Sequence, residues 1–138
     1  MGKSKKVVID TNVFISAYGW GGTPLKVVQL LGKKIIRNCV SEKILNELSS
    51  ALTYHRIAFP VKLQTNILEF VLAYSDIYEP KRRLNITPDP DDNQFIECAL
   101  SANAKFIITG DKSFLSLNKF EAIRIVTPRD FLQHITSD

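Results

Sequence analysis

Short apolar runs of strand character alternate along this chain with longer segments of helical periodicity, and this alternation limits the fold more than any other feature. The runs cover residues 7–9, 35–40, 77–78, 106–109 and 123–126. Connecting segments of ten or more residues, most of them with helical periodicity, separate them, which is the length that a crossover between parallel strands requires. The sequence therefore predicts an α/β fold: a three-layer α/β/α sandwich with a mostly parallel central sheet of about five strands.

The segments between the strands carry the start signals of helices. Thr23-Pro24 and Thr127-Pro128 each pair an N-cap residue with a proline suited to the first helical position. The expected helices cover residues 24–31, 42–54, 61–74, 92–102 and 128–135.

Length and composition fit one globular domain. The chain has 138 residues, 45% of them apolar and 23% charged, so we expect a single domain over residues 1–138 with its core at about 6–135. Two cysteines are too few for a disulfide scaffold, and no apolar run approaches the roughly 18–20 residues of a membrane span. We therefore expect a cytoplasmic protein. The net charge of +4 permits a polyanionic partner without requiring one.

Two acidic residues fall where predicted strands end. Asp10 directly follows the run 7–9, and Asp111 follows the run 106–109 across one glycine. Ligands of parallel sheets bind outside the carboxyl ends of the strands, so both acids are expected at that edge. For either acid taken alone, a turn or cap role is at least as common as ligand binding.

Two further acids lie on predicted helices. Asp92 begins the inward-facing apolar stripe of its helix. Glu47 borders the apolar face of another helix, and a glutamate in such a position is more often solvated or salt-bridged than catalytic. An N-cap role of Asp91 or Asp92 would explain one acid but not the cluster that they form with Asp89.

Several carboxylates at one sheet edge repel one another unless a cation lies among them. A donor set of oxygen atoms alone favours hard ions such as Mg²⁺ or Mn²⁺. The two histidines and two cysteines are isolated in the sequence and show no zinc spacing. The sequence thus predicts a divalent-metal site with four candidate ligands: Asp10, Glu47, Asp92 and Asp111.

Four features, taken in order along the chain, resemble the PIN domain family. They are Val7–Ala17 (VVIDTNVFISA), the helical Glu47, Asp89–Ala99 (DPDDNQFIECA) and Phe106–Leu115 (FIITGDKSFL). The resemblance extends over residues 6–135 and is greatest to PIN proteins described as toxin components of toxin–antitoxin systems, relatives of the VapC-type toxins.

This resemblance implies a Mg²⁺- or Mn²⁺-dependent endoribonuclease that hydrolyses RNA phosphodiester bonds and leaves 5′-phosphate and 3′-hydroxyl ends. It implies single-stranded RNA as the substrate, an antitoxin protein as a possible partner, and a homodimer or higher oligomer. No membrane association is implied.

The family's functional positions carry over residue by residue. Four positions match the family's acids: Asp10, Glu47, Asp92 and Asp111. Asn12 matches the polar residue that supports the first acid, and Thr109 matches the small hydroxyl residue two before the last. The family spacing and the helical stripe both select Asp92 rather than Asp91.

Basic residues near the acids are candidates for substrate binding, because an acidic site must still attract a polyanion. The candidates are Lys81, Arg82, Arg83 and Lys112. An ordinary solvated charge is an equally good interpretation of each. Tyr18 and Trp20, in a predicted glycine-rich turn, are candidates for stacking on a base or for contacting a partner subunit.

Two other functions are compatible with these features. Another Mg²⁺-dependent phosphotransferase or phosphatase would also use an aspartate after its first strand. A haloacid-dehalogenase-like enzyme, however, would have a second aspartate at position 12, where this chain has Asn12. A non-catalytic RNA- or protein-binding PIN module would keep the fold without needing the acids, and the presence of all four acids argues against it.

Overall fold

The computed structural model describes residues 5–54 and 58–137, with a central sheet in the order β3-β2-β1-β4-β6-β5. The parallel strands are β1 (Lys5–Ile9), β2 (Ile36–Val40), β3 (Ser75–Ile77), β4 (Phe106–Ile108) and β6 (Ile123–Val126). The short β5 (Lys119–Phe120) pairs antiparallel with β6 and forms one edge. The predicted fold class is confirmed, and this short edge strand brings the described sheet to six strands instead of about five.

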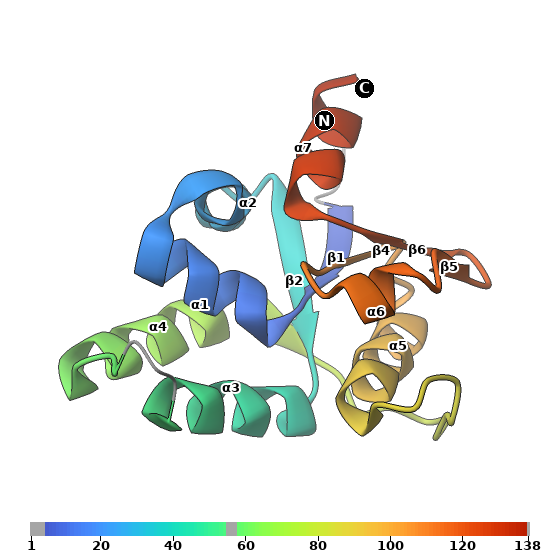
Figure 1. The fold of residues 1–138 in the computed structure, drawn as a ribbon, viewed down its shortest axis with the longest axis horizontal. Coiled ribbons are helices and arrows are strands. Elements are labelled where there is room, and N and C mark those ends of the chain that lie inside the picture. The colour runs from blue at the N-terminus through green and yellow to red at the C-terminus, as the bar shows by residue number, and fades with distance from the viewer. Residues whose placement is uncertain (1–4, 55–57, 138) are drawn as a thin grey trace.

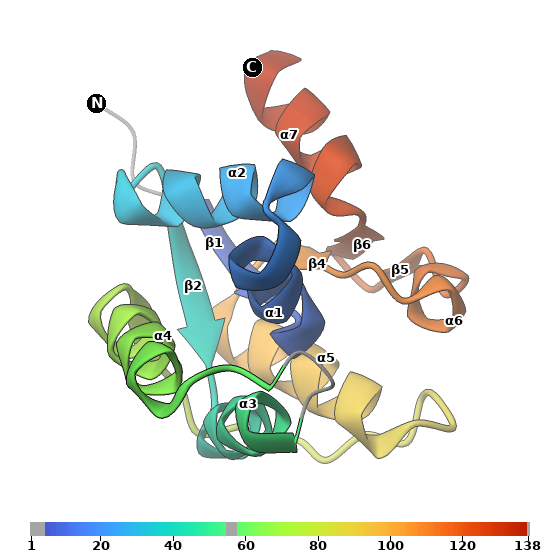
Figure 2. The same cartoon turned by 60° about the vertical axis from the view of Figure 1, so that its left-hand side comes forward.

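Helices cover both faces of the sheet. In the described residues they are α1 (Thr11–Trp20), α2 (Gly22–Gly32), α3 (Glu42–Tyr54), α4 (Val61–Ala73), α5 (Pro90–Ala102), α6 (Lys112–Leu115) and α7 (Pro128–Ser137). Figure 2 shows α1 and α2 in front of the strands and α5 behind them. Helix α3 packs against α1, α4 and α5 near the end of β2 (Figure 1). Within residues 5–54 and 58–137, none of these helices combines the length and the apolar composition of a membrane span.

A buried asparagine joins the three strands on one side of the sheet. Asn38 of β2 is fully buried, and its Oδ1 accepts a hydrogen bond from the backbone N–H of Ile9 at 3.0 Å. Its Nδ2 donates to the Oγ of Ser75 at 2.9 Å. A polar side chain is tolerated inside this strand because its hydrogen-bonding groups are satisfied. The bond to Ile9 also fixes the last residue of β1, directly before Asp10.

The glycine-rich turn predicted around Tyr18 and Trp20 is wrong, because α1 continues through this segment. Buried apolar side chains between residues 13 and 17 give α1 a face that packs into the core. Gly21 and Gly22 both have positive φ (79° and 66°), so the break between α1 and α2 is confined to this pair. Helix α2 therefore begins at Gly22 and not at Pro24.

Helix α5 also begins earlier than predicted, and the difference concerns the acidic cluster. Its N-cap is Asp89, whose side chain accepts a hydrogen bond from the backbone N–H of Asp91 at 2.9 Å, and Pro90 takes the first helical position. The alternative interpretation that Asp91 or Asp92 caps this helix is therefore wrong. Because Asp89 caps the helix, Asp92 lies in the first turn and its carboxylate is not used for capping.

Candidate active site

An acidic cavity of about 80 Å³ lies at the carboxyl ends of β1 and β4. Six acids line it: Asp10, Glu47, Asp89, Asp91, Asp92 and Asp111. The other lining residues are Thr11, Asn12 and Phe95, so no basic side chain of the described residues is among them. From β1 the chain goes to β2 on one side of the sheet, whereas β4 lies on the other side of β1. This reversal of the strand order at β1 is a topological switch point, and open α/β sheets bind their ligands at such points.

The four predicted acids reach this cavity from four different parts of the fold. Asp10 follows β1 and caps α1, and Asp111 follows β4 and caps α6. Asp92 comes from the first turn of α5, and Glu47 comes from the middle of α3. Residues up to 101 positions apart in the sequence therefore line one cavity.

Asp10 is almost fully buried, with 5% of its surface exposed, and two hydrogen bonds orient it. The hydroxyl of Thr109 donates to its Oδ2 at 2.7 Å, and the backbone N–H of Asn12 donates to its Oδ1 at 3.1 Å. Burial raises the pKa of Asp10; the two hydrogen bonds oppose this effect, and the charges of Asp111 and Asp91 add to it. Asn12 thus contacts Asp10 through its backbone, whereas Thr109 does so through its side chain.

Thr109 also links the acids that follow the two strands. While its hydroxyl donates to Asp10, its Oγ1 accepts a hydrogen bond from the backbone N–H of Asp111 at 3.1 Å. Asp111 Oδ1 in turn accepts from the backbone N–H of Ser113 at 3.2 Å, which caps α6. The fully buried hydroxyl of Thr109 therefore fixes the position of Asp10 relative to Asp111.

The remaining two acids have pKa values that reflect burial and repulsion between carboxylates. Burial, together with the charges of neighbouring aspartates led by Asp89, raises the pKa of Asp92, which is 5% exposed, to about 7. Burial also raises the pKa of Glu47, as does the charge of Asp91. In both cases the charged form is disfavoured, so a cation in the cavity would be stabilising.

The donor atoms of this cavity fit a hydrated Mg²⁺ or Mn²⁺ ion. The lining side chains that can bind a metal offer only oxygen ligands, as hard ions prefer. As the described side chains stand, no group of three or more Asp, Glu, His or Cys is arranged to hold an ion directly. The cavity of about 80 Å³ leaves room for some waters of the ion's hydration shell, because one water molecule occupies ~30 Å³ in the liquid. Thr11 Oγ1, buried beside Asp10, lacks a hydrogen-bond partner within the described residues, and such a water could supply one.

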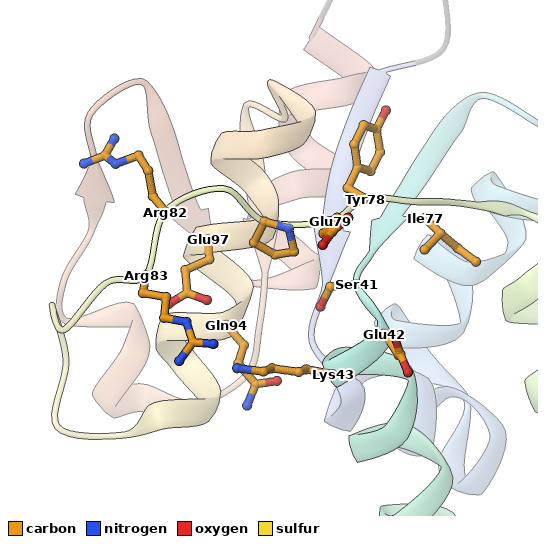
Figure 3. Close-up of a pocket in the computed structure, with 11 residues that line it drawn as sticks. Ser41, Glu42, Lys43, Ile77, Tyr78, Glu79, Arg82, Arg83, Gln94 and Glu97 are labelled. Carbon is orange, nitrogen blue, oxygen red and sulfur yellow. The ribbon is translucent and has the colours of Figure 1, made fainter.

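The predicted basic residues Lys81, Arg82 and Arg83 do not act as one group. Arg82 forms an exposed ion pair with Glu121, with Nη1 and Oε2 3.4 Å apart, and points away from the other cavity-lining side chains in Figure 3. Lys81 is held through its backbone N–H, which donates to the Oγ of Ser101 at 3.3 Å.

The other two predicted cations lie in different parts of the structure. Lys112 is the first residue of α6, directly after Asp111. Arg83 lines a second cavity, to which Lys43 of α3 also contributes (Figure 3). Sequence reasoning missed Lys43 because it lies 40 residues from Arg83 and looks like any exposed residue of an amphipathic helix.

Two buried polar residues of α5, also missed from the sequence, anchor the segment before the acidic cluster. Asn93 Oδ1 accepts hydrogen bonds from the backbone N–H groups of Ile86 and Thr87 at 3.1 and 2.9 Å. Glu97 Oε2 accepts from the backbone N–H of Leu84 at 2.8 Å. For Glu97 the available signal was a charged residue within an apolar stretch of helix, whereas Asn93, between Asp92 and Gln94, gave no such signal.

Comparisons with known sequences show what the chain as a whole is similar to. A family model described as the PIN domain matches residues 6–113. The uncharacterized protein MJ1680 of Methanocaldococcus jannaschii is 36% identical over 140 residues, an alignment that covers 93% of this chain and 90% of that protein.

Two solved structures are similar to this one. VapBC2 from Rickettsia felis, bound to a DNA fragment from their promoter, has a TM-score of 0.60 at 14% identity over 87% of this chain and 96% of that chain. PAE2754 from Pyrobaculum aerophilum has a TM-score of 0.63 at 13% identity over 99% of this chain and 92% of that chain. At sequence identities of 14% and 13%, this similarity shows a shared fold alone.

Proposed function

The chain belongs to the PIN domain family, whose members are generally nucleases, and from this premise we propose that it is a metal-dependent endoribonuclease that hydrolyses RNA phosphodiester bonds. The observation that carries the proposal is the cavity lined by six acids and no basic residue of the described chain. Such a cluster is costly unless a cation binds there, and Mg²⁺ and Mn²⁺ suit its oxygen donors.

The four acids and Thr109 would have different roles, which depend on their surroundings in the structure. Asp10 and Asp92, which are buried, would hold the ion most firmly, and Glu47 and Asp111 would bind it directly or through water. Thr109 would keep Asp10 oriented through its hydroxyl. A divalent ion in this position would supply charge neutralisation for the phosphate and the leaving oxygen and would make water a better nucleophile.

The substrate proposed is single-stranded RNA. Arg83, which lines the second cavity, and Lys112, which directly follows Asp111, are the proposed contacts to its phosphates. Lys81 and Arg82 would add to the positive potential that attracts the strand. Because an exposed ion pair such as that of Arg82 contributes little stability, it can open when a phosphate approaches.

A ribonuclease assay tests the proposal. We expect purified protein to cleave end-labelled single-stranded RNA with Mg²⁺ or Mn²⁺ but not with EDTA, and to leave 3′-hydroxyl ends. These ends distinguish the reaction from contaminating ribonucleases that use the 2′-hydroxyl as nucleophile. Asp92→Asn should lose the activity, whereas Asp130→Asn, which removes an exposed acid of α7, should retain it.

Other results would favour the alternative functions. Cleavage that persists in EDTA or in Asp92→Asn would contradict the proposed site. An absence of cleavage on several RNAs, with RNA bound equally well by wild type and Asp10→Asn, would favour a non-catalytic binding module. Capture of a phosphoryl group on Asp10 would favour a phosphotransferase.

We further propose that the protein is the toxin of a toxin–antitoxin pair and forms a homodimer or higher oligomer. The fold similarity to VapBC2 and the sequence resemblance to VapC-type toxins support the first part. Exposed apolar side chains on α4, among them Val61 and Leu72, offer surface for the second. Expression of the wild type should arrest bacterial growth while Asp92→Asn should not, and light scattering should give at least twice the mass of one chain.

A further inference from the structure

A second cavity, of about 370 Å³, opens beside the acidic one. Its walls come from the start of α3, from residues 77–83 after β3, and from α5 (Figure 3). Its volume lies within the range of roughly 300–1,000 Å³ that is common for sites of small organic ligands. The acids of the first cavity do not line it. Its charged lining residues are three cations (Lys43, Arg82 and Arg83) and three glutamates (Glu42, Glu79 and Glu97).

Gln94 connects the two cavities. It lines the second cavity and lies one helical turn after Asp91, which lines the first. The Nε2 of Gln94 donates a hydrogen bond to Asp91 Oδ1 at 3.1 Å. A polymer that crosses the acidic cavity along α5 would therefore enter the second cavity with its next unit.

Two cations meet at the boundary between the cavities. Figure 3 shows the guanidinium of Arg83 and the ammonium group of Lys43 both directed toward Gln94. Neither side chain forms an ion pair with any described acid, whereas Arg82 is engaged with Glu121. The boundary thus offers two uncommitted positive charges next to an acidic cavity that cannot hold a polyanion by itself.

The opposite wall of the second cavity is suited to an apolar group. Ile77 and Pro80 line it, and the side chain of Ile77 is 62% exposed. Cations near an apolar wall suit a ligand unit that carries a phosphate and a flat, weakly polar ring. A nucleotide has this composition, and its base can enter such a cavity only when it is unpaired.

We propose that the second cavity binds one nucleotide of single-stranded RNA, next to the phosphodiester that lies over the acidic cavity. Arg83 and Lys43 bind its phosphate, and its sugar and base lie against Ile77 and Pro80. The inference rests on the proposed ribonuclease function and adds to it a site that sets the position and the single-stranded state of the substrate.

RNA binding measured without cleavage tests the proposal. Fluorescence anisotropy in EDTA compares the wild type with the double variant Lys43→Ala/Arg83→Ala on a labelled single-stranded RNA. The matched control is Lys26→Ala/Lys62→Ala, which removes the same charge from exposed residues that line neither cavity. All four residues are exposed, and thermal melts verify that both variants fold.

We expect the Kd of Lys43→Ala/Arg83→Ala to rise about tenfold or more, because charge-assisted contacts to phosphate are lost. The slope of log K against log salt should decrease by about 0.7, since the two cations bind one phosphate and each neutralised phosphate on a single strand contributes about 0.7. The control should keep the Kd and the slope of the wild type. An abasic strand should bind the wild type about fivefold more weakly than the intact strand, because apolar burial is lost.

Equal Kd values for the pocket variant and the control would overturn the proposal, as would equally tight binding of the abasic strand. Cleavage distinguishes this failure from that of the proposed function. A wild type that cleaves RNA, with an unchanged kcat/KM in Lys43→Ala/Arg83→Ala, overturns the nucleotide site and the phosphate contact proposed for Arg83, but not the nuclease function. A wild type that binds RNA through Arg83 and Lys43 but cleaves none with any metal supports the site and overturns the nuclease function.

Discussion

Asp92→Asn should stabilise the metal-free protein while abolishing its activity. Burial and neighbouring aspartates raise the pKa of Asp92 from 3.8 to about 7, so the folded state disfavours its ionised form. A pKa difference of this size corresponds to at most about 4 kcal/mol. Because the cavity opens to solvent and its other carboxylates can take up counterions, we expect about half of this, ~2 kcal/mol, at about pH 8 in EDTA.

The pH dependence follows from the sign of the pKa change. A carboxyl group whose folded-state pKa is raised contributes stability in its protonated form, below its ordinary pKa. For Asp92 this contribution falls as the pH rises from 3.8 toward about 7, and it is absent above that value. The melting temperature of the wild type should therefore decrease relative to that of Asp92→Asn over this interval, and the variant should melt about 6–10 °C higher at about pH 8.

Circular dichroism melts in EDTA at several pH values measure this difference. Asp130→Asn is the control, because this exposed acid in the first turn of α7 should change the stability by no more than about 0.5 kcal/mol. Saturating Mn²⁺ should raise the melting temperature of the wild type but not that of Asp92→Asn. If wild type and Asp92→Asn melt together at about pH 8, or if their difference does not grow with pH, the argument from burial and repulsion is wrong.

Three further substitutions test other contacts. Thr109→Val removes the donor to Asp10 and should weaken Mn²⁺ binding about tenfold or more in calorimetric titration, with Thr109→Ser retaining affinity; an unchanged affinity in the valine variant would contradict the orienting role. Asp89→Ala should cost about 1 kcal/mol in urea unfolding by removing the cap of α5, whereas Asp89→Asn should keep the cap and lower the pKa of Asp92 measured by NMR. Asn38→Ala should cost about 2–3 kcal/mol in urea unfolding, because it leaves a buried backbone N–H of β1 without a partner; a cost below about 1 kcal/mol would refute this.

The sequence by itself determined the layered fold and the identity of four of the six acids that line the cavity. Strand and helix periodicity is local, so it can be read from consecutive residues such as 7–9 and 106–109. Asp10 and Asp111 could be assigned to the same edge because the carboxyl ends of parallel strands coincide. Their membership of one cavity followed from topology and not from their separation in the sequence.

Only the tertiary structure decided which side chains contact one another. The choice of Asp89 as the cap, which leaves Asp92 available, depended on where the segment before α5 is anchored by Asn93. Arg83 points toward Lys43, whereas Arg82 pairs with Glu121. This difference depended on the path of residues 77–83 across α5. Such pairings are set by packing between elements far apart in the chain, so local sequence patterns do not predict them.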